Sequence, residues 1–472
     1  LVPGQAESYE KTENEDGTVT YTFKLRDGIK WSDGKDVTAG DFEYSWKRLV
    51  NPETAADYNY MLDGVVNATE IMAGEKDPDE LAAKALDDKT FEVTLVNDLN
   101  YFEELCAFPA MMPVREDMIE KAGDQWTFDT ATYISNGAYK LKEWTHNSQI
   151  VVEKNENYYD VENLGPETIT FKLMDDQNAM LSGFNSGELD FIEDVPQAEI
   201  ANLIASGDMK IVDYIGTYYV CFQTQKAPFD DPRVRKAFSL AIDRTYIVNQ
   251  VTQSGQVEAG GFVPSGVYDA DGADGDDFRT VGGDYYKPTD ADYEANCDEA
   301  RQLLADAGYP NGEGFPVVEY LYNTSDAHKA VAEALQFMWE EELGVKVTLN
   351  NQEWAAFLQT RKDGDYSIAR NGWIADYNDP ISFLDMWMTG GGNNDAQYAN
   401  DDYDALIKQA KTTTDNAERM DLLHQAEDKL IGEDSVLAPL YFYTQKYMLA
   451  DGIEGMYYCP LGYFFFGYTH QA

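Results

Sequence analysis

This sequence predicts an α/β fold divided into several units, and three observations lead to that prediction. The chain has 472 residues, more than a single hydrophobic core usually organises. Segments that alternate apolar and polar side chains, typical of half-buried strands, recur along it. Between residues 317 and 349, a strand pattern, a helix pattern and a second strand pattern follow one another, as in a β-α-β unit. We therefore expect mixed sheets covered by helices.

Residues 1–110 are predicted to form a small α+β unit. Residues 18–25 and 90–96 alternate apolar and polar side chains, which predicts a strand in each segment. Residues 37–50 predict a helix, because Thr38 suits the N-cap position and the apolar side chains that follow fall on one helical face.

Residues 111–225 are predicted to form a second unit of mixed α/β type. The patterns predict strands over 149–153 and 168–173, then a helix over 176–186. Residues 187–193 read as a turn that leads into another strand. The alternation of helix and strand suits a mixed sheet.

Residues 226–445 are predicted to form a third unit, also α/β. A long amphipathic helix over 231–250 opens it, with Pro232 in the first turn, where proline is favoured. Gly344 ends the helix of the β-α-β segment. The other elements expected in this unit are strands over 317–322, 345–349 and 436–443 and helices over 327–343 and 417–431.

Composition and motifs exclude several classes of function. The formal net charge is −51, from 86 acidic and 35 basic residues, so nucleic acid is excluded as a natural partner. No P-loop and no Gly-x-Ser-x-Gly or His-Glu-x-x-His motif occurs. The acidic loop 266–286 lacks the ligand order of an EF-hand. Counted from Asp269, the fifth position is Ala273 and the twelfth is Thr280, and neither supplies the expected acidic ligand. We expect no metal, no cofactor and no catalytic residue.

The segment 371–380 holds the most informative acid. Asp376 follows Trp373 by three residues, and the run 366–370 before this segment reads as a strand that ends there. A carboxylate at a strand end, flanked by Trp373 and Tyr377, is placed to meet a cation in a partly dry cleft. Alternatively, Asp376 caps the helix predicted at 380–387. On the residues alone, both interpretations stay open.

Four segments together resemble one family, the oligopeptide-binding proteins of bacterial ABC importers (extracytoplasmic solute-binding protein family 5). They are residues 25–42, 227–244, 322–328 and 371–380, and the similarity runs nearly end to end. The resemblance implies a two-lobed, class II periplasmic-binding-protein-like fold with an extra small domain, 1–110. The first lobe would be 111–225 plus 446–472 and the second 226–445. It also leads us to expect that an export signal and the first strands of the main domain precede residue 1.

The same resemblance implies a peptide site. Asp376 would take the peptide ammonium, and Asn371 and Gly372 would offer backbone groups beside it. Basic side chains would bind the carboxyl end of the peptide, and aromatic side chains would line the pockets for the peptide's side chains. The implied basic residues are Arg361, Arg370 and His328, and the aromatic ones are Tyr58, Tyr218, Tyr219, Trp354, Trp373 and Tyr377. For each arginine the alternative is an internal salt bridge, and for the aromatic matches it is a place in the core.

The implied function is capture of oligopeptides in a cleft between lobes and delivery to the membrane permease subunits of an importer. The protein would be an extracytoplasmic monomer, either periplasmic or a cell-surface lipoprotein, without cofactor or catalysis. Two alternatives stay open. The fold could carry a dipeptide, a nickel chelate or an oligosaccharide, or the chain could be an extracytoplasmic hydrolase. The pattern Asn-Gly-Trp-Ile-Ala-Asp favours peptides, because its acid needs an amine.

Overall fold

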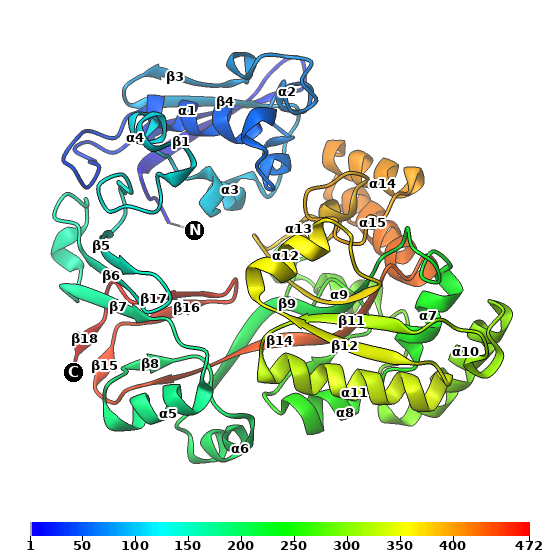
Figure 1. Ribbon diagram of the computed structural model, residues 1–472. Coiled ribbons are helices and arrows are strands. Elements are labelled where there is room, and N and C mark those ends of the chain that lie inside the picture. The colour runs from blue at the N-terminus through cyan, green and yellow to red at the C-terminus, as the bar shows by residue number, and fades with distance from the viewer. Residues whose placement is uncertain (1) are drawn as a thin grey trace. The chain divides into compact units, whose positions relative to one another are not determined.

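The chain divides by its contacts into two compact units in the computed structural model, which describes residues 2–472 apart from the Asp290 side chain (Figure 1). Unit 1 comprises the residues up to Ala179 with Ala450–Cys459 and Tyr463–Ala472, and unit 2 comprises Met180–Leu449 with Pro460–Gly462. Residues 180–225 therefore group with the expected second lobe. The finer division into three parts stays a prediction.

A four-stranded antiparallel sheet with strand order β1-β2-β4-β3 forms the first part of unit 1. The strands are β1 (Ala6–Glu13), β2 (Val19–Leu25), β3 (Ala83–Asp87) and β4 (Thr90–Leu95). Helix α1 (Ala39–Val50) packs on β3 and β4. It begins at a capping box, in which the Thr38 backbone N–H donates to Asp41 Oδ2 at 2.8 Å. The predicted strands and helix of this region are confirmed.

The rest of unit 1 contains a three-stranded sheet and two short two-stranded pairs. The sheet has the order β5-β6-β7, with β5 (Tyr139–Thr145), β6 (Gln149–Lys154) and β7 (Thr168–Lys172). The C-terminal segment adds β15 (Ile453–Glu454) paired with β18 (His470–Gln471), and β16 (Tyr457–Cys459) paired with β17 (Tyr463–Phe465). The short helices are α2 (Ala68–Met72), α3 (Phe102–Leu105) and α4 (Glu116–Ala122).

Unit 2 is built on a seven-stranded mixed sheet with the order β10-β14-β9-β13-β11-β12, and β8 pairs with the end of β14. The strands are β8 (Phe191–Ile192), β9 (Lys210–Phe222), β10 (Val257–Glu258), β11 (Val318–Asn323), β12 (Val347–Gln352), β13 (Ile368–Ile374) and β14 (Leu437–Leu449). The long strands β9 and β14 lie antiparallel side by side (Figure 1). β9 also pairs with β13, so these strands together hold the residues of the candidate site.

Helices pack against this sheet and close its core. Helix α11 (Asp326–Leu343) connects the parallel strands β11 and β12, so the predicted β-α-β unit is confirmed. Its Trp339 is fully buried and donates from Nε1 to the Phe238 carbonyl at 2.8 Å. The remaining helices are α5 (Gln177–Ser186), α6 (Gln197–Ser206), α7 (Pro232–Leu240), α8 (Arg244–Tyr246), α9 (Phe278–Gly282), α10 (Tyr293–Asp306), α12 (Trp354–Lys362), α13 (Ile381–Leu384), α14 (Asp401–Thr412) and α15 (Asn416–Glu427). No helix among the described residues is long and apolar enough to cross a membrane.

The predicted single helix over 231–250 is wrong, because the chain breaks between α7 and α8. Arg244 is 1% exposed, and its guanidinium is satisfied by backbone carbonyls. It donates to Ser239 O at 3.0 Å and to Pro439 O at 2.7 Å. Asp243 then caps the next turn, accepting from the Tyr246 N–H at 2.8 Å. The Arg244 guanidinium thus satisfies carbonyls that are left open where the helix breaks.

The strand predicted to end at residue 370 runs four residues further. Strand β13 continues to Ile374 because β9 supplies an antiparallel partner along its whole length, from Phe222 opposite Ile368 to Gly216 opposite Ile374. The turn-like composition of 371–374 suggested an earlier end. Ladder hydrogen bonds from a distant strand overrode that local preference. Asp376 consequently lies two residues beyond the end of β13.

Candidate functional site

One edge of β13 has no strand partner over most of its length. β13 pairs with β9 over 368–374 but with β11 only at Ile368 and Ala369. Residues alternate in direction along an antiparallel pair. Ala375 donates to Ile215 O on the β9 side, so Gly372 points to the opposite edge, where its N–H is held by Asn371 Oδ1 at 2.8 Å. Within the described chain, the β13 edge from Arg370 to Ile374 is thus unpaired by any strand.

Gly372 is required by a close approach of Tyr443. A Cβ atom at position 372 would collide with the Tyr443 hydroxyl. Asn371 is buried, and its side-chain Nδ2 donates a hydrogen bond to Asp395 Oδ2 at 3.0 Å. The two predicted residues therefore keep the backbone of this edge in place and leave it free of bulky side chains.

Asp376 is a mostly buried acid without a cationic partner among the described residues. Burial raises the pKa of its carboxyl to about 8, the negative charge of Asp385 adds to that rise, and a hydrogen bond with Ser382 opposes it. The Ser382 hydroxyl also accepts from the Asp376 backbone N–H at 2.8 Å. An uncompensated buried carboxylate is costly for a fold and typical of a site that awaits a positive charge.

The alternative that Asp376 caps the following helix is not what the structure has. Pro380 occupies the N-cap position of α13, and the acid whose Oδ1 accepts from the Ile381 backbone N–H, at 2.9 Å, is Asp379. Asp379 is also held by a bidentate pair from Arg419, at 2.6 and 2.8 Å, and both side chains are buried. This pair anchors the segment after Asp376 to α15 and leaves the Asp376 side chain to another role.

Arg370 is a cation on β13, six residues before Asp376. Its guanidinium lies over the Tyr218 ring, 5.2 Å from the centroid, and its Nε is buried without a hydrogen-bond partner. No carboxylate lies within ion-pair distance of it in the described part of the chain. The phenol groups that surround it are those of Tyr218, Tyr320, Tyr441 and Tyr443. Arg370 therefore carries a charge that no residue described here neutralises.

His328 lies beside Arg370 but is not a cation. Burial lowers the pKa of its imidazole to about 2, and the nearby charges of Arg370 and Lys446 contribute to the decrease. Its Nδ1 is 3.3 Å from the Tyr218 hydroxyl. Grouping His328 with the charged arginines is therefore corrected, because a buried imidazole next to a guanidinium stays neutral. Its contact with a ligand stays a prediction.

Arg361 is already engaged within the protein. It is 7% exposed, its Nη2 lies 3.3 Å from Asp395 Oδ2, and its guanidinium covers the Phe357 ring at 4.6 Å. Its Nη1 also donates to the Arg370 carbonyl at 3.4 Å. For Arg361, the structure therefore contains the internal salt bridge, to Asp395, that the sequence analysis gave as the alternative to ligand contact. Arg361 supports the position of Arg370, and its direct contact with a ligand stays a prediction.

The predicted aromatic residues of unit 2 fall into exposed and buried groups. Trp354 is 52% exposed at the start of α12 and stacks on Phe357, with centroids 5.9 Å apart. Trp373 is half-buried and donates from Nε1 to the Ser382 carbonyl at 2.7 Å, which ties α13 to β13. The remaining predicted aromatics, Tyr218, Tyr219 and Tyr377, are buried within unit 2.

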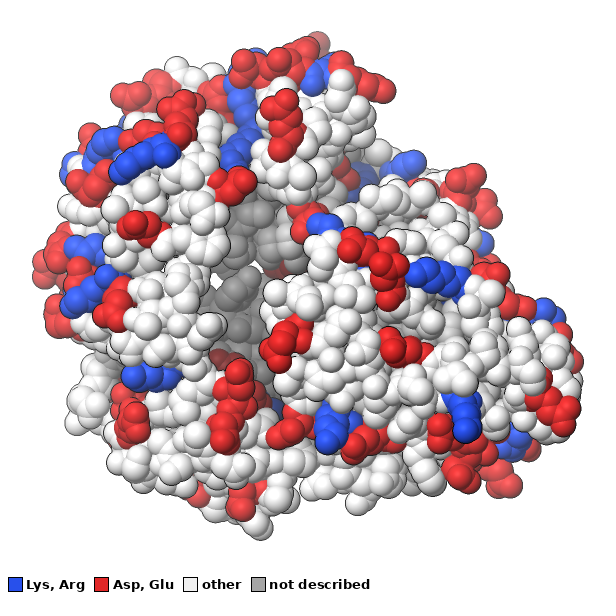
Figure 2. Space-filling view, in the orientation of Figure 1, with Lys and Arg blue, Asp and Glu red and all other residues white. Residues whose placement is uncertain are grey.

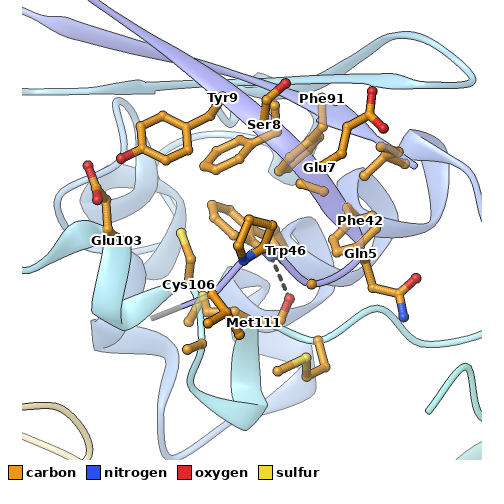
Figure 3. A pocket seen from close by; sticks show the side chains of 18 residues that line it. Gln5, Glu7, Ser8, Tyr9, Phe42, Trp46, Phe91, Glu103, Cys106 and Met111 are labelled. Carbon is orange, nitrogen blue, oxygen red and sulfur yellow. Dashed lines mark hydrogen bonds between the residues drawn. The ribbon is translucent and has the colours of Figure 1, made fainter. Parts of the chain in front are cut away.

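Tyr58 belongs to unit 1, where its ring lies 5.2 Å from that of Phe108. Unit 1 also contains a cavity of about 630 Å³ beneath β1, bordered by Trp46 and Cys106, with Tyr9 and Glu103 facing one another at its edge (Figure 3). Its lining is mainly apolar and includes no basic side chain. The cavity therefore offers no cation for a peptide carboxylate, whereas β13 of unit 2 carries Arg370.

Sequence reasoning missed four residues that shape this site. Ser382 and Asp385 lie in or just after the helix that follows Asp376, and Tyr443 and Asp395 come from segments much later in the chain. The pattern Asp-x-x-x-x-x-Ser could have drawn attention to Ser382. Nothing in the local sequence marks Tyr443, which reaches Gly372 only because β9 brings β13 and β14 together.

Acidic side chains are spread across the face shown in Figure 2, with basic side chains set between them. The chain as a whole has a formal charge of −51, and no continuous basic patch appears on this face. A surface of this kind repels polyanions. It is compatible with a cationic group bound at Asp376.

Comparisons with known proteins agree on one family. The family model described as bacterial extracellular solute-binding proteins, family 5 Middle, matches residues 1–395. The periplasmic oligopeptide-binding protein OppA of Salmonella typhimurium is 39% identical over 458 residues, which cover 96% of this chain and 81% of that protein. The solved structure of Haemophilus influenzae OppA in complex with the peptide RPPGFSPFR has a TM-score of 0.88 at 33% identity, covering 96% of this chain and 86% of that one. Listeria monocytogenes OppA bound to peptide has a TM-score of 0.89 at 30% identity, covering 99% and 90%.

Proposed function

This chain belongs to the bacterial extracellular solute-binding proteins of family 5, and from that premise we propose that it captures oligopeptides with a free amino terminus for an ABC importer. The observation that carries the proposal is the Asp376 carboxyl, which is mostly buried and has no cationic partner among the described residues. A peptide ammonium would supply the missing charge. Membrane permease subunits would receive the loaded protein, and it would act as an extracytoplasmic monomer, periplasmic or anchored as a lipoprotein.

The open edge of β13 supports a peptide rather than another cargo. An extended peptide can add to an unpaired strand edge through main-chain hydrogen bonds that do not depend on its sequence. Asp376 and Arg370 are six residues apart, which is at most about 20 Å along an extended strand. A short extended peptide could therefore place its ammonium at Asp376 and its carboxylate toward Arg370. An oligosaccharide has no need of either charge.

Arg370 should discriminate peptides by their carboxyl end. Replacing it with Gln is expected to weaken binding of a peptide with a free carboxylate by about ten- to 150-fold, because a charge-assisted hydrogen bond contributes about 1.5–3 kcal/mol. The same peptide with an amidated end should lose less than threefold. Isothermal titration calorimetry on both peptides measures the difference. Equal losses for the two peptides would remove Arg370 from the carboxylate role.

Peptide affinity should depend on pH with a maximum near 8. Asp376 must be ionised to receive an ammonium, and with a pKa of about 8 it becomes protonated as the pH falls. The peptide amine, whose ordinary pKa is about 8, must remain protonated and loses its charge as the pH rises. Affinity should therefore fall about tenfold for each pH unit below 7 and above 9. Fluorescence titration between pH 5.5 and 9.5 measures the profile, and a flat acid side would contradict it.

Native mass spectrometry of the protein as purified tests the proposed function directly. The expected result is a monomer that carries peptide masses, which are released on denaturation and absent from an Asp376→Asn preparation. Incubation of the protein with a defined peptide mixture separates binding from hydrolysis. Intact peptides after prolonged incubation are expected, and cleavage products would favour the hydrolase alternative.

A further inference from the structure

The Ser382 side chain holds the main chain at the point where β13 leaves its strand partner. The ladder with β9 reaches as far as Ala375, whose N–H donates to the Ile215 carbonyl at 2.8 Å. The next N–H along the chain, that of Asp376, donates to the Ser382 hydroxyl, also at 2.8 Å. Ser382 is only 2% exposed, so water does not compete for this bond. A serine of α13 thus takes over from β9 in fixing the backbone of Asp376.

The main chain of Ser382 holds a second residue of the candidate site. Its carbonyl accepts from Trp373 Nε1 at 2.7 Å. Trp373 lies just before the end of β13 and Asp376 lies two residues beyond that end. One buried serine is therefore bonded to the indole on one side of the strand end and to the acid on the other. Because hydrogen bonds are directional, this arrangement restricts how the turn between the two residues can move.

Ser382 is itself tied to a helix of the core. Its N–H donates to the Asp379 carbonyl at 3.1 Å. The Asp379 side chain is fixed to α15 by its bidentate pair with Arg419, at 2.6 and 2.8 Å. A continuous series of bonds therefore runs from α15 through Asp379 and Ser382 to the backbone of Asp376. Through this series the rigid part of unit 2 restrains a residue that follows the last ladder bond of its strand.

We propose that Ser382 is a positioning residue for the amine site, because its hydroxyl holds the backbone of Asp376 so that the carboxyl is presented to the ammonium of a ligand. This inference rests on the proposed function, since the ammonium belongs to that function. Ser382 does not touch the ligand in this scheme and acts only through Asp376. Its loss should therefore affect ligands with a free amine and spare those without one.

Ser382→Ala removes the hydroxyl and leaves the main-chain bond to Trp373 in place. Affinity for a peptide with a free amino terminus should fall about tenfold, because a buried N–H loses its acceptor and the carboxyl loses its fixed position. Affinity for the N-acetylated copy of that peptide should change by less than threefold. Isothermal titration calorimetry measures both values. Equal losses for the two peptides would show a general structural role and overturn the proposal.

Two further variants separate positioning from loss of stability. Ser239→Ala is the matched control, because Ser239 is also buried in unit 2 and its hydroxyl accepts from Arg244 Nη2 at 3.1 Å. It should leave both peptide affinities within threefold of wild type. Ser382→Cys keeps the size of the side chain but offers only a weak acceptor, so it should behave like Ser382→Ala and carries the test if the alanine variant does not fold.

A double-mutant cycle tests whether Ser382 acts through Asp376. In the Asp376→Asn background there is no carboxylate to present to an ammonium, so adding Ser382→Ala should reduce affinity for the free peptide by less than threefold further. A further tenfold loss in the double variant would mean that Ser382 acts on the ligand by another route, and the proposal would fall.

A last readout needs no ligand. Amide hydrogen exchange at Asp376, resolved by mass spectrometry with electron-transfer fragmentation, should be at least tenfold faster in ligand-free Ser382→Ala than in wild type, and unchanged in Ser239→Ala. Unchanged exchange at Asp376 in folded Ser382→Ala would overturn the proposal. If exchange accelerates as expected but wild type binds no peptide, Ser382 does hold Asp376 and the proposed function is what fails.

Discussion

Asp376→Asn is expected to weaken binding of a peptide with a free amino terminus at pH 7.5 by a hundredfold or more. Removing one partner of a buried charge pair costs about 3–5 kcal/mol, mostly because the other charge is left without compensation. In the proposed complex, that remaining charge is the peptide ammonium. Isothermal titration calorimetry of wild type and variant with the same peptide measures the loss.

An N-acetylated copy of the peptide provides the matched control. It has no ammonium, so it should bind wild type weakly and should distinguish wild type from Asp376→Asn by less than threefold. Asp230→Asn removes one exposed acid of the same unit and should leave both affinities unchanged. If Asp376→Asn binds the free peptide within threefold of wild type, the ammonium does not meet this carboxylate.

The same substitution should stabilise the protein when no ligand is present. Folding raises the Asp376 pKa from its ordinary value of 3.8 to about 8. The folded state therefore holds this proton more tightly than the unfolded state, and the cost of the charge is fully present above pH 8 and disappears as the pH falls below 4. Asn resembles the protonated acid. At pH 8, Asp376→Asn should raise the free energy of unfolding by about 2–4 kcal/mol, less than the whole shift implies because water reaches part of the site.

Urea unfolding of peptide-free protein at several pH values checks this prediction. The advantage of Asp376→Asn over wild type should shrink steadily between pH 8 and pH 4.5, because wild type then gains the proton that the variant does not need. Saturating peptide should reduce this advantage at pH 8, since the peptide binds wild type more tightly than the variant and therefore stabilises wild type more. A variant that is less stable than wild type at every pH would mean that the carboxylate has an internal partner.

Much of the architecture follows from short-range patterns. The strands around residues 19–25, 90–95 and 168–172 follow from alternating side chains, and Thr38 and Gly344 mark helix ends through chemistry confined to a few neighbouring residues. The parallel pair β11–β12 follows from three consecutive patterns. Local signals were sufficient in these places because the deciding interactions lie within about one element.

Where the deciding interaction is distant in sequence, the prediction failed or stayed open. The helix break before Arg244 depends on the Pro439 carbonyl, and the extension of β13 to Ile374 depends on β9. The internal pairing of Arg361 depends on Asp395, and the neutrality of His328 depends on burial next to Arg370. No pattern in the neighbouring sequence predicts these partners.

The sequence by itself determined the class of fold and the family, and it led to the proposal that Asp376 holds an amine, because the motif around Asp376 is continuous in the chain. Only the tertiary structure decided which charges are already neutralised. Arg361, Asp379 and Asp385 each have a partner from another element, whereas no residue described in the structure neutralises Asp376 or Arg370. The physical reason is that the charge state of a buried group depends on what surrounds it in space, and folding assembles those surroundings from residues far apart along the chain.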